Sequence, residues 1–161
     1  MRVTFTKTAE RKYRIDVEGK GLVRSYLDPA FGYDPLLPHD MAHFVVENEL
    51  GLQGGVFGQL ANGGSGAFKP LETPKNSRAE KRGNRISTAG KRDAALAERV
   101  IFRAQRTWMK GDMSDVPKVM DVPQRDIDRI CLEFERVSSI WSSLAIGGSM
   151  SLEWTAGKKR R

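Results

Sequence analysis

The sequence has 161 residues, of which 39% are hydrophobic and 29% charged, and it carries a net charge of +7. This length suits a single domain, 1–161, that buries a core unaided, and the one cysteine, Cys131, excludes an internal disulfide. The N-terminus lacks the apolar stretch of a signal peptide, and no window has the roughly 18 apolar residues of a spanning helix. We therefore expect a cytoplasmic protein with no membrane partner.

Alternating hydrophobic and polar residues predict β-strands near both ends of the chain. The alternation covers residues 3–5 and 13–17, and a glycine-containing turn at 19–21 leads to a further run at 22–27. Two alternating runs around such a turn are typical of a hairpin. Alternation at 150–155 predicts a C-terminal strand that pairs with the N-terminal meander.

Three helices are predicted between these strands. The first spans 38–50, begins at a proline that the first helical turn tolerates, and ends before Gly51. The second spans 93–110 and the third 123–145, both with apolar residues at amphipathic spacing. The elements predict an α+β fold, in which a small antiparallel sheet packs against two long helices with a short additional helix.

Positive charge is concentrated in two polar segments. Residues 62–92 open with glycines and serine and carry eight lysines and arginines against two glutamates, and the tail 158–161 adds four basic residues. Without these two segments the chain has a net charge of about −3. We expect 62–92 to be a flexible basic insertion, because it has few large apolar groups to anchor it.

The two histidines of the sequence, His39 and His43, lie four residues apart on the first predicted helix. This spacing puts both imidazoles on one helix face, about 6 Å apart along the axis, where both can reach one metal ion. They are candidate ligands for zinc or another divalent metal. The alternative is a structural role, in which the imidazoles hydrogen-bond to loop carbonyls.

The sequence has no further histidine, so a third ligand has to be a carboxylate. Glu47 is nearest on the helix, but it lies about 12 Å along the axis from His39, too far for both to share one ion. Asp34 and Asp28 in the preceding loop are better placed. We therefore predict Asp34 as the third ligand.

The segment from His39 to His43, His-Asp-Met-Ala-His, resembles the His-Glu-x-x-His helix of zinc metallopeptidases. The resemblance covers five residues, and Asp40 stands in place of the glutamate. It implies that both histidines bind zinc and that Asp40 is the catalytic base, although aspartate is one methylene shorter. The longer string Leu-Pro-His-Asp-x-x-His-Phe-x-Val-Glu resembles an uncharacterised family of bacterial proteins, which implies no activity.

Two functions remain open. The first is a metal-binding, hydrolase-like protein that uses His39 and His43. The second is a non-enzymatic module that binds an acidic partner, or nucleic acid weakly and non-specifically, through its basic segments. The basic run 75–92 lacks the aromatic residues on which bases stack. The glycines at 51–58 do not form a phosphate-loop motif and predict turns and close packing instead.

Overall fold

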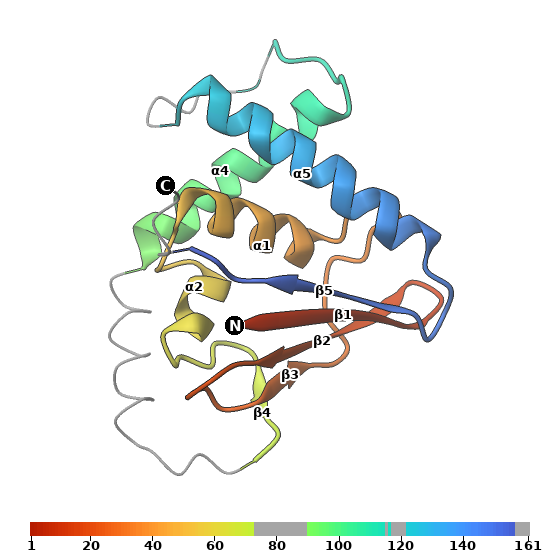
Figure 1. Ribbon diagram of the computed structural model, residues 1–161. Helices are drawn as coiled ribbons and strands as arrows, with labels where there is room; N and C mark the ends of the chain where they lie inside the picture. The colour runs from red at the N-terminus through yellow and green to blue at the C-terminus, as the bar shows by residue number, and fades with distance from the viewer. Residues whose placement is uncertain (73–89, 115, 117–121, 157–161) are drawn as a thin grey trace.

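A five-stranded antiparallel sheet with helices on one face forms the described part of the chain, which in this computed structural model is residues 1–72, 90–114, 116 and 122–156 (Figure 1). The strands are β1 (Arg2–Ala9), β2 (Lys12–Glu18), β3 (Ser25–Leu27), β4 (Lys69–Pro70) and β5 (Ser149–Glu153). The helices are α1 (His39–Leu50), α2 (Val56–Ala61), α4 (Lys91–Trp108) and α5 (Gln124–Ser143). The predicted α+β fold is confirmed.

The sheet has the order β4-β3-β2-β1-β5 and is apolar on one face only. The C-terminal strand pairs with the N-terminal one, as the alternation predicts, with Val3 opposite Leu152 and Phe5 opposite Met150. These four side chains are buried, while Ser149, Ser151 and Glu153 on the other face of β5 are exposed. The polar face of the sheet is therefore open to solvent, and the apolar face carries the helices.

Helix α1 lies at the centre of the helical layer, between the sheet and the two long helices (Figure 1). Residues 41–47 are all buried, and seven consecutive residues cover the full circumference of a helix. Phe44 packs with Phe5 of β1, Phe57 of α2 and Trp154 after β5, at ring-centroid distances of 6.5, 5.2 and 5.9 Å. The sequence predicted a short helix beside the two long ones, whereas the other helices in fact pack around it.

The two long helices complete the layer. Helices α4 and α5 contact each other and α1, and Trp141 of α5 packs edge-on against Tyr13 of β2. The indole nitrogen of Trp141 donates to the carbonyl of Asp34, so that α5 also holds the loop before α1. Helices α1, α4 and α5 lie within three residues of their predicted bounds, whereas α2 was not predicted. None of the described helices has the length and apolar character needed to cross a membrane.

The structure corrects the predicted insertion at both of its ends. Lys69–Pro70 forms β4, which pairs with β3, and Phe68 before it is buried. Helix α4 begins at Lys91, inside the range predicted to be irregular. Residues 73–89 of the insertion and the tail 158–161 lie outside the described residues.

Candidate metal centre

Three side chains from two helices meet at the N-terminal end of α1. His39 and His43 lie on successive turns, and their Nε2 atoms are 3.1 Å apart. Oε1 of Glu98 on α4 is 3.2 Å from Nε2 of His43 and 3.7 Å from Nε2 of His39. Among the described residues, these three form the one group of histidine, cysteine and carboxylate side chains that could hold a metal ion.

The spacing of the three ligand atoms fits a tetrahedral zinc site. Zinc binds histidine nitrogen and carboxylate oxygen at about 2.0–2.2 Å, which places tetrahedral ligand atoms about 3.3–3.6 Å from one another. The three separations, 3.1, 3.2 and 3.7 Å, lie close to that range.

A buried carboxylate orients the inner histidine. Nδ1 of His43 lies 3.3 Å from Oε1 of Glu47, one turn further along α1. An ionised carboxylate only accepts hydrogen bonds, so Nδ1 carries the proton and donates it. In the neutral imidazole, the lone pair is then on Nε2, the nitrogen that faces His39 and Glu98. A carboxylate behind a histidine is the usual support of a metal-binding imidazole.

Glu47 is held in turn by the start of α2. Its side chain is completely buried, and its two oxygens accept hydrogen bonds from the backbone N–H groups of Val56, Phe57 and Gly58 at 2.9, 2.8 and 3.2 Å. These are donors that the first turn of a helix leaves unpaired, and the helix dipole favours a negative charge beside them. A side chain at Gly55 would overlap the Glu47 carboxylate, so glycine is required there.

The cluster is buried on one side and open on the other. The His43 side chain is 9% exposed and that of Glu47 is 0% exposed, whereas His39 is 47% and Glu98 58% exposed. Glu47 and His43 thus form an inner, rigid part of the centre. Solvent or a small ligand reaches the outer part, at His39 and Glu98.

The charge state of His43 reflects its two carboxylate neighbours. Burial lowers its pKa, but the hydrogen bond and negative charge of Glu47, followed by those of Glu98, raise it more. The net result is a pKa above the ordinary value of 6.5. Near neutral pH, protons therefore compete with any metal ion for Nε2 of His43.

Asp40 lies next to the cluster, but its carboxylate is in a hydrogen bond with Tyr13 of the sheet. Its Oδ2 is 2.6 Å from the hydroxyl oxygen of Tyr13 on β2, which also contacts the backbone carbonyl of Phe31. Burial raises the pKa of Asp40, and the hydrogen bond from Tyr13 and the positive charges of the two histidines lower it by less. The Tyr13 hydroxyl has one proton for two acceptors, so it donates to the Asp40 carboxylate or to the Phe31 carbonyl, one at a time.

The structure brings together some of the predicted site residues. His39 and His43 face one another, and Asp40 adjoins them. Asp34 lies outside the cluster, since its Oδ1 accepts the backbone N–H groups of Leu36 and Leu37 and so shapes the loop before α1. The carboxylate that completes the group is Glu98, which the sequence analysis did not identify.

The position of Glu98 on α4 is the one signal in the sequence that could have identified it. Glu98 follows Ala97 and lies one turn before Ile101, and both of these residues belong to the buried stripe of α4. A carboxylate on the border of such a stripe faces the neighbouring helix. The sequence does not say which helix that is, because Glu98 is 55 residues away from His43 along the chain.

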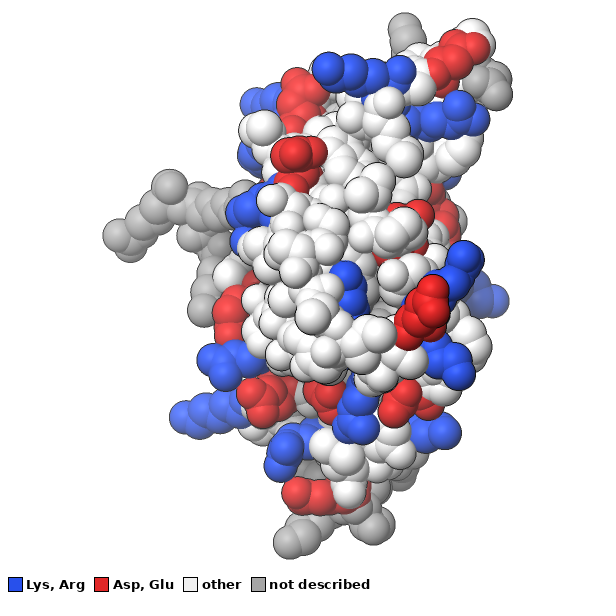
Figure 2. All heavy atoms as spheres, turned by 90° about the vertical axis from the view of Figure 1, so that its right-hand side faces the viewer, with Lys and Arg blue, Asp and Glu red and all other residues white. Residues whose placement is uncertain are grey.

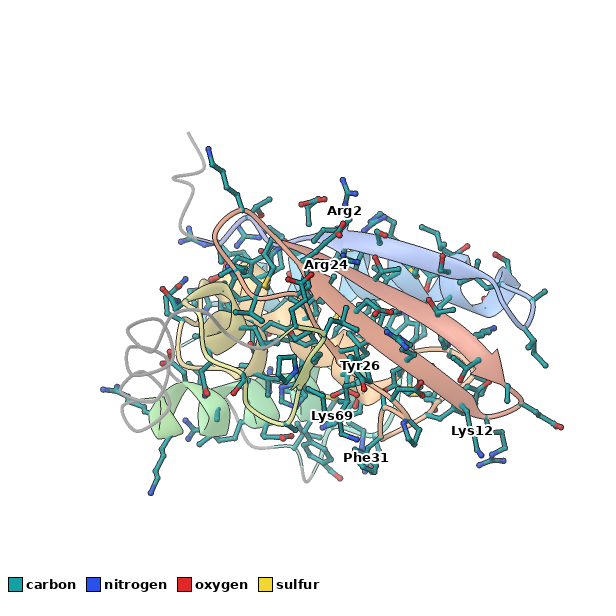
Figure 3. All side chains as sticks on the ribbon, turned by 90° about the horizontal axis from the view of Figure 1, so that it is seen from below. Arg2, Lys12, Arg24, Tyr26, Phe31 and Lys69 are labelled. Atoms are coloured by element: carbon teal, nitrogen blue, oxygen red, sulfur yellow. The ribbon has the colours of Figure 1, made fainter. Side chains whose placement is uncertain are left out.

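Neither of the two faces drawn in Figures 2 and 3 carries a continuous basic surface among the described residues. On the open face of the sheet, Arg2 is paired with Glu18 and Glu153, and Arg14 with Asp16. Figure 3 shows the labelled cations of this face spread from Lys12, at one end of β2, to Arg2, Arg24 and Lys69. On the face in Figure 2, basic and acidic side chains alternate around an uncharged centre. The segments that carry the charge excess lie largely outside the described residues.

Comparisons with known proteins do not add a family to this picture. No protein family model, curated protein or solved structure matches the chain. The function therefore has to follow from the chemistry of the site itself.

Proposed function

We propose that the protein binds a zinc ion through His39, His43 and Glu98. The single observation that carries this proposal is the convergence of three ligand atoms, from two helices, at separations of 3.1 to 3.7 Å. Two histidines and one glutamate are a ligand set that zinc uses in catalytic sites. Another divalent ion that accepts imidazole and carboxylate ligands is compatible with the same group.

Support for a ligand role, as opposed to a structural one, comes from the way His43 is held. Glu47 accepts the hydrogen bond from Nδ1–H of His43, which leaves the lone pair on Nε2. That lone pair faces two further candidate ligand atoms, Nε2 of His39 and Oε1 of Glu98. In the part of the chain that the structure describes, the hydrogen-bond partners of the imidazoles are Glu47, Glu98 and each other, and not the loop carbonyls that the structural alternative expected. A centre that is rigid inside and open outside suits an exchangeable or reactive ion.

Hydrolytic chemistry is an extension of the same proposal. A zinc ion with three protein ligands keeps a fourth position for water and lowers the pKa of that water. Asp40 adjoins His39, and its raised pKa suits a group that exchanges protons closer to neutral pH. Asp40 as the catalytic base remains a prediction, to be tested with Asp40→Asn, which should keep zinc binding and remove any hydrolysis.

The experiment is a metal titration of the purified protein. We expect one zinc ion per chain, and loss of stoichiometric binding in His39→Ala, His43→Ala and Glu98→Ala. Glu133→Gln, a glutamate on α5 that pairs with Arg136, is the matched control and should bind like the wild type. A protein that takes up no divalent ion, but is retained on nucleic acid at low salt, would replace this proposal with the polyanion-binding alternative.

A further inference from the structure

The metal centre forms only if α4 lies at the correct position along α1. His39 and His43 come from α1, whereas Glu98 comes from α4, which the sequence connects to α1 through the 40 residues 51–90. Glu98 is five residues after Asp93 in the first turn of α4, about 7.5 Å along the axis. Contacts at the start of α4 therefore decide where Glu98 lies.

The start of α4 lies against Gly54, in the loop between α1 and α2. The backbone of Gly90, the residue before α4, lies directly against the backbone of Gly54, and a side chain on either glycine would overlap the other. The N–H of Gly54 also donates to Oδ2 of Asp93 at 2.8 Å. Two backbones in contact leave no room for adjustment, since neither partner is the flexible end of a side chain.

Gly54 is also fixed to the part of the protein that holds His43. Its carbonyl accepts a hydrogen bond from the side-chain amide of Gln59 in α2, at 2.8 Å. The next residue, Gly55, packs on the Glu47 carboxylate, and the residues after it donate to that carboxylate. A short rigid segment thus runs from the support of His43 to the start of the helix that carries Glu98.

We infer that Gly54 is a positioning residue for the metal centre, whose backbone contact with Gly90 sets the distance between Glu98 and the two histidines. This inference rests on the proposed metal-binding function. A methyl group at position 54 would push the first turn of α4 away from α2 and carry Glu98 with it. Gly54 touches none of the ligands, and we expect its effect on metal binding to pass through Glu98. An effect that passed through Gly55, Glu47 and His43 instead would not depend on Glu98.

The test is zinc affinity in a double-mutant cycle, measured by competition with a chromophoric chelator at fixed pH. Gly54→Ala should weaken zinc binding by about 10-fold or more, the range known for residues that support metal ligands. In a Glu98→Gln background, the same substitution should cost less than about twofold, because the carboxylate through which it acts is absent. Independent effects would instead add, and the cost would be equal in both backgrounds. Gly111→Ala, at the other end of α4, is the matched control and should bind like the wild type, since its added methyl meets only the flexible Arg106 side chain closely.

Substitutions of Asp93 test the same inference without adding atoms to the contact between Gly54 and Gly90. Asp93→Ala removes the acceptor for the Gly54 N–H and should weaken zinc binding, while Asp93→Asn keeps an oxygen and should restore most of it. This pair decides the question if Gly54→Ala does not fold. An unchanged affinity in Gly54→Ala, or an equal loss with and without Glu98, would overturn the inference while leaving zinc binding intact. Wild-type binding that does not depend on Glu98 would overturn the proposed function as well.

Discussion

Glu47 shows how one side chain connects folding to the site. Its two oxygens accept three backbone N–H groups of α2 and lie beside the inner histidine, all without exposure to water. A buried carboxylate is stable only when it is surrounded by donors in this way. The carboxylate that holds α2 in place through three hydrogen bonds therefore also chooses the tautomer of His43.

Replacement of Glu47 should lower both metal affinity and stability. Glu47→Gln places an amide N–H₂ against backbone donors, so we expect zinc affinity to fall about 10- to 100-fold and the free energy of unfolding to fall by about 1–3 kcal/mol. Zinc competition and urea denaturation measure the two effects. Glu10→Gln, on the exposed β1–β2 turn, is the control. Full zinc affinity in Glu47→Gln would contradict the orienting role.

The raised pKa of His43 predicts the pH dependence of zinc binding. Zinc needs the neutral imidazole, so affinity should be highest above the raised pKa and should fall as the pH drops through it. In the zinc-free protein, the contribution of His43 to folding stability has the opposite pH dependence. The stabilisation of protonated His43 by Glu47 and Glu98 is present below pH 6.5 and is lost as the pH rises through the raised pKa. Titrations between about pH 5.5 and 8 check this, and a pH-independent affinity would exclude His43 as a ligand.

At the level of elements, α1 is the helix on which the core depends. Phe44→Ala should cost about 3–5 kcal/mol of unfolding free energy, because the ring is buried against three other aromatic side chains. Leu132→Ala on α5 is the matched control, since Leu132 is 73% exposed and its loss should change stability by less than about 0.5 kcal/mol. Urea denaturation separates the two outcomes. Similar losses in both variants would mean that α1 is not the centre of the core.

The elements differ in how far their sequences predicted them. Helices α4 and α5 have a clear apolar stripe, so the sequence located them closely. Helix α2 was missed because it has six residues, follows two glycines, and owes its first turn to Glu47, a contact that no local pattern contains. Strand β4 was missed for a similar reason, since its two residues pair with β3, which has only three residues.

The site was predictable on one helix only. The four-residue spacing of His39 and His43 was visible in the sequence, and the estimate that Glu47 lies too far along α1 to share their ion agrees with its place behind His43. Glu98 required the relative position of two helices, which depends on backbone contacts such as that of Gly54 with Gly90. Hydrophobic periodicity predicts which face of a helix is buried but not which helix it meets.

At the level of the whole molecule, zinc should raise the thermal stability. A ligand that binds only the folded state at 100 times its Kd adds about 2.7 kcal/mol. For a chain of this size, that corresponds to roughly 5–10 °C in Tm. Thermal unfolding followed by circular dichroism, with zinc and with chelator, should show this shift in the wild type and no shift in His39→Ala or His43→Ala. An equal shift in both variants would place the zinc elsewhere.

The burial of residues 41–47 of α1 also determines how the protein exchanges its amide hydrogens. Residues 41–47 are covered by the sheet, α2, α4 and α5, so no small opening exposes their backbone to water. The amides in the middle of α1 should therefore be the slowest to take up deuterium, and their exchange should report the free energy of global unfolding. Because His43 belongs to this slowest group, an ion in the proposed centre would enter and leave from the exposed side, at His39 and Glu98.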